Sequence, residues 1–484
     1  MDKSAAALLV LVLIVASCLI MIQPAKADSR TITVIDTSEL TNAINYAEDG
    51  DIVFVKKGTY DMPKNQTLVI GRSISLIGED AQSTTIILHP PWVATGGFHL
   101  GSNGVESDYA YDNPIKIQAS NVTVSGFTLE CDVGRSILTT GDRIQIVGNI
   151  FKTGLFVMGS HQNIAQNTFV HSDIQCYGSY NTIAGNMILG ESIVSGASGS
   201  FNFICGNTIT DGYGIHLVTN GNIVVNNTVR NCSYGVAIAS IGASSDNVVC
   251  QNILTNNEIG LSVPSGEKNN VLYANEVAYN QQGVVAVYWS PPTGVNTFYH
   301  NNFVGNARQV NTDSIMVLDG STTVAAYHSG SFDDGKEGNY WSDYSGSDAD
   351  GDGIGDSPYV IDANRSDHYP LITLFNISNV TLELPEWAYP LPSQPPPALP
   401  SPSPSPSPTE SPSPSISPNP SPSTSASPSS SPTPQATSEP TQSAQPSTEP
   451  FPTVPVLAAF VIVVVIVVAG LLVYQMRRQR SQSS

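Results

Sequence analysis

The sequence predicts an all-β fold, a single-stranded parallel β-helix, because one short pattern recurs about every 20 residues. In the pattern, apolar residues alternate around two asparagines, as in Asn181–Ile188 and Asn202–Ile209. The second asparagine of each repeat recurs after 18, 19, 21, 20, 25, 23 and 26 residues. These marker asparagines are Asn149, Asn167, Asn186, Asn207, Asn227, Asn252, Asn275 and Asn301. Each repeat holds two or three β-type runs separated by Gly, Asn or Ser, with no helical pattern between them.

The marker asparagines have a structural interpretation. Stacked coils lie about 4.8 Å apart, so equivalent side-chain amides align and bond from coil to coil. We therefore expect an asparagine ladder within the β-helix repeats, residues 63–330, rather than a ligand site.

The N-terminal part contains two accessory segments. Residues 1–27 are typical of a signal peptide, with Lys3 before an apolar run and small residues at 25 and 27. A lipobox-like sequence that ends at Cys18 is the alternative. Residues 28–62 are expected to form a cap and the first coil, since an open solenoid end would expose apolar side chains. A capping helix there is indicated by a capping box, Asp36 and Glu39, and by one apolar face, Leu40, Ala43, Ile44 and Ala47.

Residues 331–385 are expected to form an Asp/Gly-rich loop and C-terminal cap. Its sequence matches the first nine positions of an EF-hand calcium loop, with predicted ligands Asp348, Asp350, Asp352, Ile354 and Asp356. Position twelve is Tyr359, so a bound Ca²⁺ would need a further ligand such as Asp343 or Asp362. The alternative is an acidic turn that closes the solenoid.

The C-terminal segments predict attachment to a cell membrane. Residues 386–454 are rich in Pro, Ser and Thr and predict a disordered stalk, and residues 455–475 predict one transmembrane helix. Residues 476–484 form a basic tail. Basic residues just after a span mark its cytoplasmic side, which places the N-terminal domain outside the cell in a single-pass topology.

Charge and cysteine content narrow the function. A net charge of −21 argues against nucleic acid as a partner. The five cysteines after the signal peptide are scattered and predict no disulfide framework, and Cys205 and Cys250 would lie two coils apart. Seven sequons would be accessible outside the cell, at Asn65, Asn121, Asn226, Asn231, Asn364, Asn376 and Asn379.

Catalytic candidates are few. The strand before each asparagine segment has an outward column, Gln175, Val194, His216, Ala237, Ser262 and Val285, which contains no carboxylate. If the protein is an enzyme, the predicted constellation is Asp173 and Glu191 on adjacent coils, with Asp211 and His216. The alternative for these four residues is a role as solvated edge and turn residues.

Four further segments carry a family resemblance: Gly50–Val55, Gly58–Tyr60, Ile74–Gly78 and Asn339–Tyr344. With the repeats, they make residues 30–370 similar to right-handed β-helices of the pectate-lyase-like superfamily, and most to the NosD-like, periplasmic copper-binding-protein-like group. The stalk and anchor are similar to those of archaeal surface proteins. The superfamily contains lyases, hydrolases, epimerases, adhesins and assembly factors, so the resemblance implies the fold more than the function.

Three functions remain open. The first is a non-catalytic surface binding or adhesion module that contacts carbohydrate or surface proteins through Tyr177, Tyr213, Tyr234 and Trp289. The second is a polysaccharide lyase, hydrolase or epimerase. The third is a copper-linked assembly factor, which is disfavoured because none of the eight histidines is paired at ligand spacing.

Overall fold

The computed structural model describes residues 29–89, 113–131, 137–195, 199–238, 244–263, 268–288, 294–311, 313, 315–318, 322–325, 327–328 and 330–385. The predicted signal peptide, stalk, transmembrane helix, basic tail and Trp289 lie outside these residues. Within them, no helix is long and apolar enough to cross a membrane.

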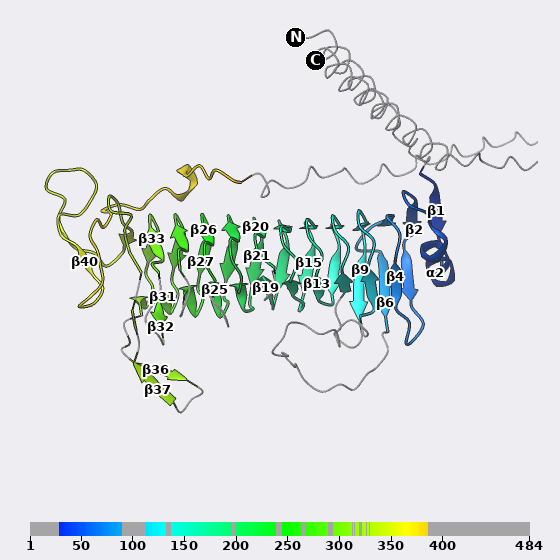
Figure 1. Ribbon diagram of the computed structural model, residues 1–484, viewed down its shortest axis with the longest axis horizontal. Helices are drawn as coiled ribbons and strands as arrows, with labels where there is room; N and C mark the ends of the chain where they lie inside the picture. The colour runs from blue at the N-terminus through cyan, green and yellow to red at the C-terminus, as the bar shows by residue number, and fades with distance from the viewer. Residues whose placement is uncertain are drawn as a thin grey trace, which may run out of the picture. The chain divides into compact units, whose positions relative to one another are not determined.

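The described chain winds as a parallel β-solenoid in which successive coils add strands to three long sheets, here called A, B and C (Figure 1). Sheet A contains β1 Thr31–Val34, β2 Ile52–Val55, β5 Ser75–Gly78, β8 Thr123–Ser125, β11 Gln145–Val147, β14 Asn163–Ala165, β17 Thr182–Ala184, β20 Phe203–Cys205, β23 Ile223–Val225, β26 Val248–Cys250, β29 Val271–Tyr273 and β33 Thr297–Tyr299. Sheet B contains β3 Gly58–Asp61, β6 Thr84–Leu88, β9 Thr128–Cys131, β12 Ile150–Lys152, β15 Thr168–Val170, β18 Met187–Leu189, β21 Thr208–Thr210, β24 Thr228–Arg230, β27 Ile253–Thr255, β30 Glu276–Ala278, β34 Asn302–Val304 and β39 Tyr340–Trp341. Sheet C contains β4 Leu68–Ile70, β7 Ile115–Ile117, β10 Ile137–Thr139, β13 Leu155–Val157, β16 Ile174–Cys176, β19 Ser192–Ser195, β22 Gly214–Leu217, β25 Tyr234–Ile238, β28 Ile259–Ser262, β31 Gln282–Val285 and β35 Arg308–Val310.

The core is a set of apolar columns that run through the coils. Ile183 pairs with Ile164 and Ile204 in sheet A, and all three side chains are fully buried. Phe151 and Phe169 stack in the same way in sheet B, with ring centroids 4.5 Å apart. The alternation predicted from the sequence is confirmed, since Ile174, Ile193 and Ile215 point inward while Gln175, Val194 and His216 form the outward column.

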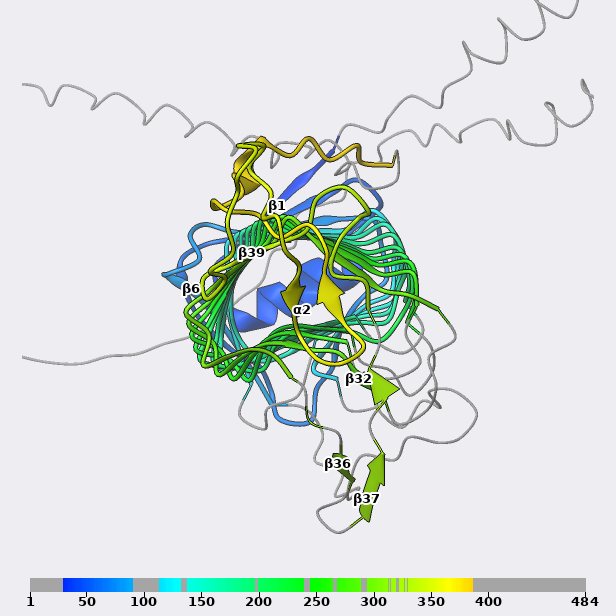
Figure 2. The same ribbon diagram turned by 90° about the vertical axis from the view of Figure 1, so that its left-hand side faces the viewer.

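The N-terminal cap is the helix α2, Thr37–Tyr46, which lies across the end of the solenoid in Figure 2. Asp36 is its N-cap, and its side chain accepts a hydrogen bond from the backbone N–H of Glu39. Leu40, Ala43 and Ile44 are buried against the first coils. The predicted capping helix is therefore confirmed.

The predicted asparagine ladder is also confirmed. From Asn149 onward, the backbone N–H and the side-chain amide of each marker both donate to Oδ1 of the next, at N···O distances of 2.9 to 3.2 Å. The ladder continues from Asn301 to Asn339, whose backbone N–H donates to the carboxylate of Asp367.

Two more ladders follow the other turns of the coil. One runs from Gln162 through Asn181, Asn202, Asn222, Asn247 and Asn270 to Asn296. The other runs from Cys232 through Asn257 and Asn280 to Asn306. Most ladder residues directly follow a residue with positive φ, such as Tyr180 (59°) or Asn256 (55°). A single left-handed residue turns the chain sharply, and the buried amide behind it satisfies backbone groups that the turn leaves unpaired.

The C-terminal cap closes the solenoid with aromatic rings. Trp341 stacks between Phe303 and Tyr359, at 4.4 Å from each, and its indole N–H donates to Asp367 at 2.8 Å. Tyr359–Val360 (β40) and Ser366–Asp367 (β41) form a short antiparallel pair here. Two other antiparallel pairs join β32 Val287–Tyr288 to β38 Tyr327–His328, and β36 Ile315–Leu318 to β37 Thr322–Ala325.

Residues 371–385, here called the strap, then run back along the outside of sheet A (Figure 1). The strap includes a short 3-10 helix, Ile377–Asn379. Leu382 and Leu384 pack on an apolar outer patch of sheet A, formed by Phe203, Ile223, Val225 and Cys250. The sequence did not predict this segment as separate from the cap.

Candidate functional site

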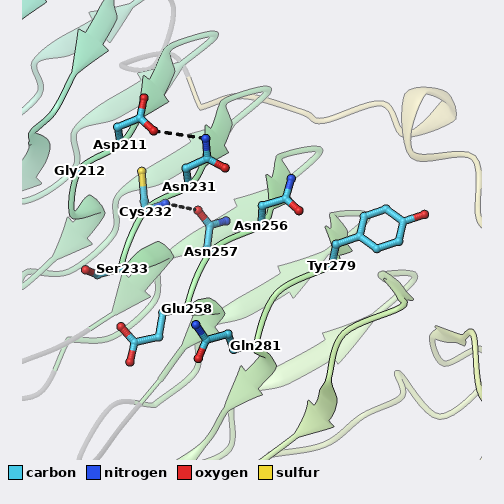
Figure 3. A pocket seen from close by; sticks show the side chains of 10 residues that line it. All are labelled: Asp211, Gly212, Asn231, Cys232, Ser233, Asn256, Asn257, Glu258, Tyr279 and Gln281. Atoms are coloured by element: carbon cyan, nitrogen blue, oxygen red, sulfur yellow. Dashed lines mark hydrogen bonds between the residues drawn. The ribbon is translucent and has the colours of Figure 1, made fainter.

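A shallow depression lies where the coils turn from sheet B to sheet C. Its lining residues come from four consecutive coils: Asp211, Gly212, Asn231, Cys232, Ser233, Asn256, Asn257, Glu258, Tyr279 and Gln281 (Figure 3). We call it the turn groove. Its volume is about 490 Å³, and amide, hydroxyl and carboxylate groups dominate its surface.

The groove follows from the local backbone. Asp211, Asn231, Asn256 and Tyr279 occupy equivalent positions with φ between 55° and 61°. Asn and Asp tolerate this left-handed conformation better than most residues, and their side chains point away from the core. Asn231 donates to Asp211 Oδ1 at 3.2 Å, and Asn257 accepts from the backbone N–H of Cys232 at 2.9 Å (Figure 3).

One exposed tyrosine lines the groove, and a second follows a lining residue in the chain. Tyr279 is 63% exposed, and Tyr213, next to Gly212, is 59% exposed. The ring of Tyr279 lies over Gly305, where an added Cβ would be 2.9 Å from Cε1. The two tyrosines are three coils apart, which is about 14 Å at the usual strand spacing. No role for Tyr279, for Glu258 or for the row of left-handed residues was predicted from the sequence. A signal was present, since Asn231 and Asn256 recur in that row with the period of one coil.

The structure brings together two of the four predicted catalytic residues. Glu191 is half-buried, and burial followed by the negative charge of Asp173 raises its pKa, while His171 acts in the opposite direction. Asp173 accepts a hydrogen bond from Gln175 Nε2 at 2.6 Å. This pair lies on the same turn edge as the groove, since the backbone of Gly212 packs against that of Glu191.

Asp211 lies one coil further along this turn edge, whereas His216 lies apart from the other three. Asp211 lines the groove and is bonded to Asn231. His216 lies on the outer face of sheet C, where its ring meets Tyr234 edge-on at 5.2 Å and Nε2 is 3.2 Å from the carbonyl oxygen of Tyr213. Burial lowers the pKa of His216. No carboxylate contact of His216 is seen among the described residues.

Of the other predicted aromatic contacts, Tyr177 is tilted against Phe156, and its hydroxyl donates to Gln175. Tyr234 packs against His216. Tyr213 is therefore the most exposed of the predicted aromatic residues that the structure describes.

The predicted calcium loop is a compact turn. Asp348, Asp350 and Asp352 offer carboxylate oxygens within 4.8 Å of one another, while Asp348 accepts from the backbone N–H groups of residues 351, 352 and 353. Asp356 accepts from Ser347 and Ala349. Of the two proposed additional ligands, Asp362 is paired with Arg365, and Asp343 accepts from Tyr359.

The described cysteines and histidines do not fit a copper site. Within the described ranges, the acidic loop is the one place where three metal-ligating side chains of the His, Cys, Asp or Glu type converge. The five cysteines that the structure describes are free, as predicted, and burial raises the pKa of Cys205 and Cys250 to about 11.

The fold and its ladders define a right-handed parallel β-helix protein. The family model for periplasmic copper-binding protein (NosD) matches residues 93–268 and 221–346, which together span more than half of the chain. The chain therefore belongs to the NosD family, as the sequence resemblance implied. The comparison with curated proteins gave no match.

Similar solved structures share little sequence with the chain. A PL6-family alginate lyase is 10% identical over 61% of this chain and 55% of the lyase, with a TM-score of 0.33. The A-module of a mannuronan C-5 epimerase from Azotobacter vinelandii is 12% identical over 58% of this chain and 91% of its own, with a TM-score of 0.35. An endo-xylogalacturonan hydrolase from Aspergillus tubingensis is 11% identical over 60% and 96%, with a TM-score of 0.40. This chain thus spans about half the length of the lyase.

Proposed function

We propose that this protein is a carbohydrate-binding β-helix displayed outside the cell, and that the turn groove is its binding site. The observation that carries the proposal is a polar depression with the exposed Tyr279 in its lining and a second exposed tyrosine, Tyr213, directly after the lining residue Gly212. Sugar hydroxyls pair with amide, hydroxyl and carboxylate groups, and the apolar faces of sugar rings pack on aromatic rings.

The groove has the dimensions of an oligosaccharide site. It follows the solenoid axis over four coils, so an extended chain of a few sugar units would meet equivalent groups at each coil. The backbone beneath it is held by coil-to-coil hydrogen bonds, such as Asn231 N–H to Thr255 O at 3.3 Å and Asn256 N–H to Ala278 O at 3.2 Å. A rigid site loses little conformational entropy when a ligand binds.

The enzyme alternative rests on Glu191 and Asp173. A carboxyl with a raised pKa can hold a proton near neutral pH and act as a general acid beside an ionised partner. Binding without turnover is preferred, because the described groove lining contains no histidine, lysine or arginine to serve as a partner for a uronate.

Display at the cell membrane is the second part of the proposal. It is supported by the predicted signal peptide, the Pro/Ser-rich stalk and the apolar segment before the basic tail. Such a stalk would hold the β-helix away from the membrane and within reach of surface glycans or neighbouring proteins. Ca²⁺ held at the loop 348–356 would serve as a structural ion in the cap.

A glycan array probed with the full-length protein tests the binding site. We expect binding to extended glycans, with a loss of about three- to tenfold in affinity on Tyr213→Ala or Tyr279→Ala. Tyr46→Ala is the matched control, since Tyr46 is 77% exposed on the capping helix. Chromatography of the glycans after incubation with the protein tests the enzyme alternative. New glycan products that the unaltered protein forms and the Glu191→Gln variant does not form would show that the protein is an enzyme.

A further inference from the structure

We infer that the turn groove accepts neutral and amine-bearing glycans and rejects glycans that carry uronate or sulfate groups. The inference rests on the proposed function and specifies its ligand class. It follows from the charges that face the groove.

The groove lining carries negative charge on two of its four coils. Asp211 and Glu258 are exposed in its lining, and the lining contains no lysine or arginine. Glu191 lies one coil before Gly212, and Asp173 is close enough to raise the pKa of Glu191 by its charge. Four carboxyl groups thus follow one edge of the solenoid.

Few cations oppose this charge. Arg230 ends the strand next to Asn231 and is exposed, and His171 lies beside Glu191. Arg308, a few coils away, is already paired with Asp313 at 3.0 Å, and Lys152 with Glu130 at 2.6 Å. An acidic sugar placed over Asp211 and Glu258 would therefore face two like charges, with the guanidinium of Arg230 beside the groove as a single opposing charge. Like-charge contacts at an interface disfavour a ligand, while opposite charges favour it.

Neutral sugars avoid this penalty, since carboxylates accept hydrogen bonds from hydroxyl groups. A sugar with a free amino group gains further, because its ammonium group can pair with Asp211 or Glu258. Exposed pairs of this kind change affinity by about two- to fivefold each.

The test is calorimetric titration of the full-length protein in EDTA with three probes of equal length: glucosamine oligomers, neutral N-acetylglucosamine oligomers and oligogalacturonate. We expect the affinity to fall in that order. In the variant Asp211→Asn/Glu258→Gln, the ratio of the affinity for glucosamine oligomers to the affinity for neutral oligomers should shrink by about four- to 25-fold. The control Glu48→Gln/Glu383→Gln changes the net charge equally at exposed carboxylates elsewhere and should preserve the order.

The outcomes separate the two claims. Binding of oligogalacturonate as tight as that of the neutral oligomer would overturn the charge selection and leave carbohydrate binding in place. Binding of none of the three probes, together with a silent glycan array, would overturn the proposed function and the selection with it.

Discussion

The side-chain amide of Asn302 makes two hydrogen bonds with the backbone of Phe375, 73 residues later in the chain. Nδ2 donates to the Phe375 carbonyl oxygen at 2.9 Å, and Oδ1 accepts from its N–H at 2.8 Å. Gln251 Nε2 donates to the carbonyl groups of Ile377 and Val380, which fixes the next stretch of the strap. The strap thus ties the C-terminal cap to coils that precede it, just before the predicted stalk begins.

Loss of the strap contacts should destabilise the C-terminal half of the solenoid. We expect Leu382→Ala/Leu384→Ala to cost about 2 to 4 kcal/mol, because both side chains cover the apolar patch on sheet A. Leu374→Ala is the control, since that leucine is 57% exposed on the same segment. Thermal melting with limited proteolysis reports the change. Equal melting temperatures for the double variant and the control would show that the contacts of Leu382 and Leu384 contribute no stability.

The asparagine ladder predicts that substitution of a single buried asparagine lowers the free energy of unfolding strongly. Asn207→Ala removes Oδ1, which accepts from Asn186 N and Nδ2, and Nδ2, which donates to Ile183 O and Asn227. Unpaired buried polar groups cost about 1 to 3 kcal/mol each, so we expect a loss of at least about 3 kcal/mol. Denaturant unfolding measures it. The control is Asn379→Ala, an exposed residue in the middle of the strap, and a similar small loss of unfolding free energy in both variants would contradict the ladder's role.

Stability should depend on pH through Asp367. Burial raises the pKa of this carboxyl to about 6, against the effect of the N–H donors of Asn339, Trp341 and Tyr369. A pKa raised in the folded state means that the folded chain binds the proton more tightly than the unfolded chain. The stabilisation is therefore complete below about pH 4 and is lost as the pH rises through about 6.

The contribution of Asp367 to the free energy of unfolding should fall by on the order of 3 kcal/mol between pH 4 and pH 7. Asp367→Asn should abolish this pH dependence. Melting temperatures of the unaltered protein and of Asp367→Asn from pH 4 to pH 7 test this prediction. Both proteins lose stability at low pH as groups such as Asp51 are protonated, so this common effect cancels in the comparison. A difference between the two proteins that does not change over that range would contradict the raised pKa.

Calcium should stabilise the C-terminal cap. Bound Ca²⁺ would relieve the repulsion between Asp348, Asp350 and Asp352, so we expect the melting temperature to rise with millimolar Ca²⁺ and to fall in EDTA. Asp350→Asn/Asp352→Asn should remove the response, while Glu383→Gln, an exposed carboxylate nearby in sequence, should retain it. No response of the unaltered protein would identify the loop as an acidic turn alone.

Much of the fold was predictable because a solenoid repeats its sequence with its structure. The alternation around Ile174 and Ile193, the ladder from Asn149 to Asn301 and the helix capped by Asp36 each depend on contacts within a coil or between neighbours. The strap was not predictable, because its contact between Asn302 and Phe375 joins residues 73 positions apart and has no period.

The candidate site was predictable only in part. Asp173, Glu191 and Asp211 were found because carboxylates stand out on a neutral edge, and the structure places them along one turn edge. Tyr279 was missed because in the sequence it looks like any turn residue, and its exposure depends on Gly305 in the next coil.

The sequons were found from the sequence, but at Asn121 and Asn226 the pattern also follows from the coil. A left-handed Asn is followed there by an inward residue and a strand-initiating Thr.

Carbohydrate binding in the turn groove is tested most directly by calorimetric titration of one neutral glycan, chosen from the array, into the full-length protein and into Tyr213→Ala/Tyr279→Ala. We predict saturable binding to the unaltered protein and to the Tyr46→Ala control, and a loss of about tenfold or more in the double variant, because both ring platforms are removed. Unchanged affinity in the double variant would contradict the assignment of the groove as the binding site.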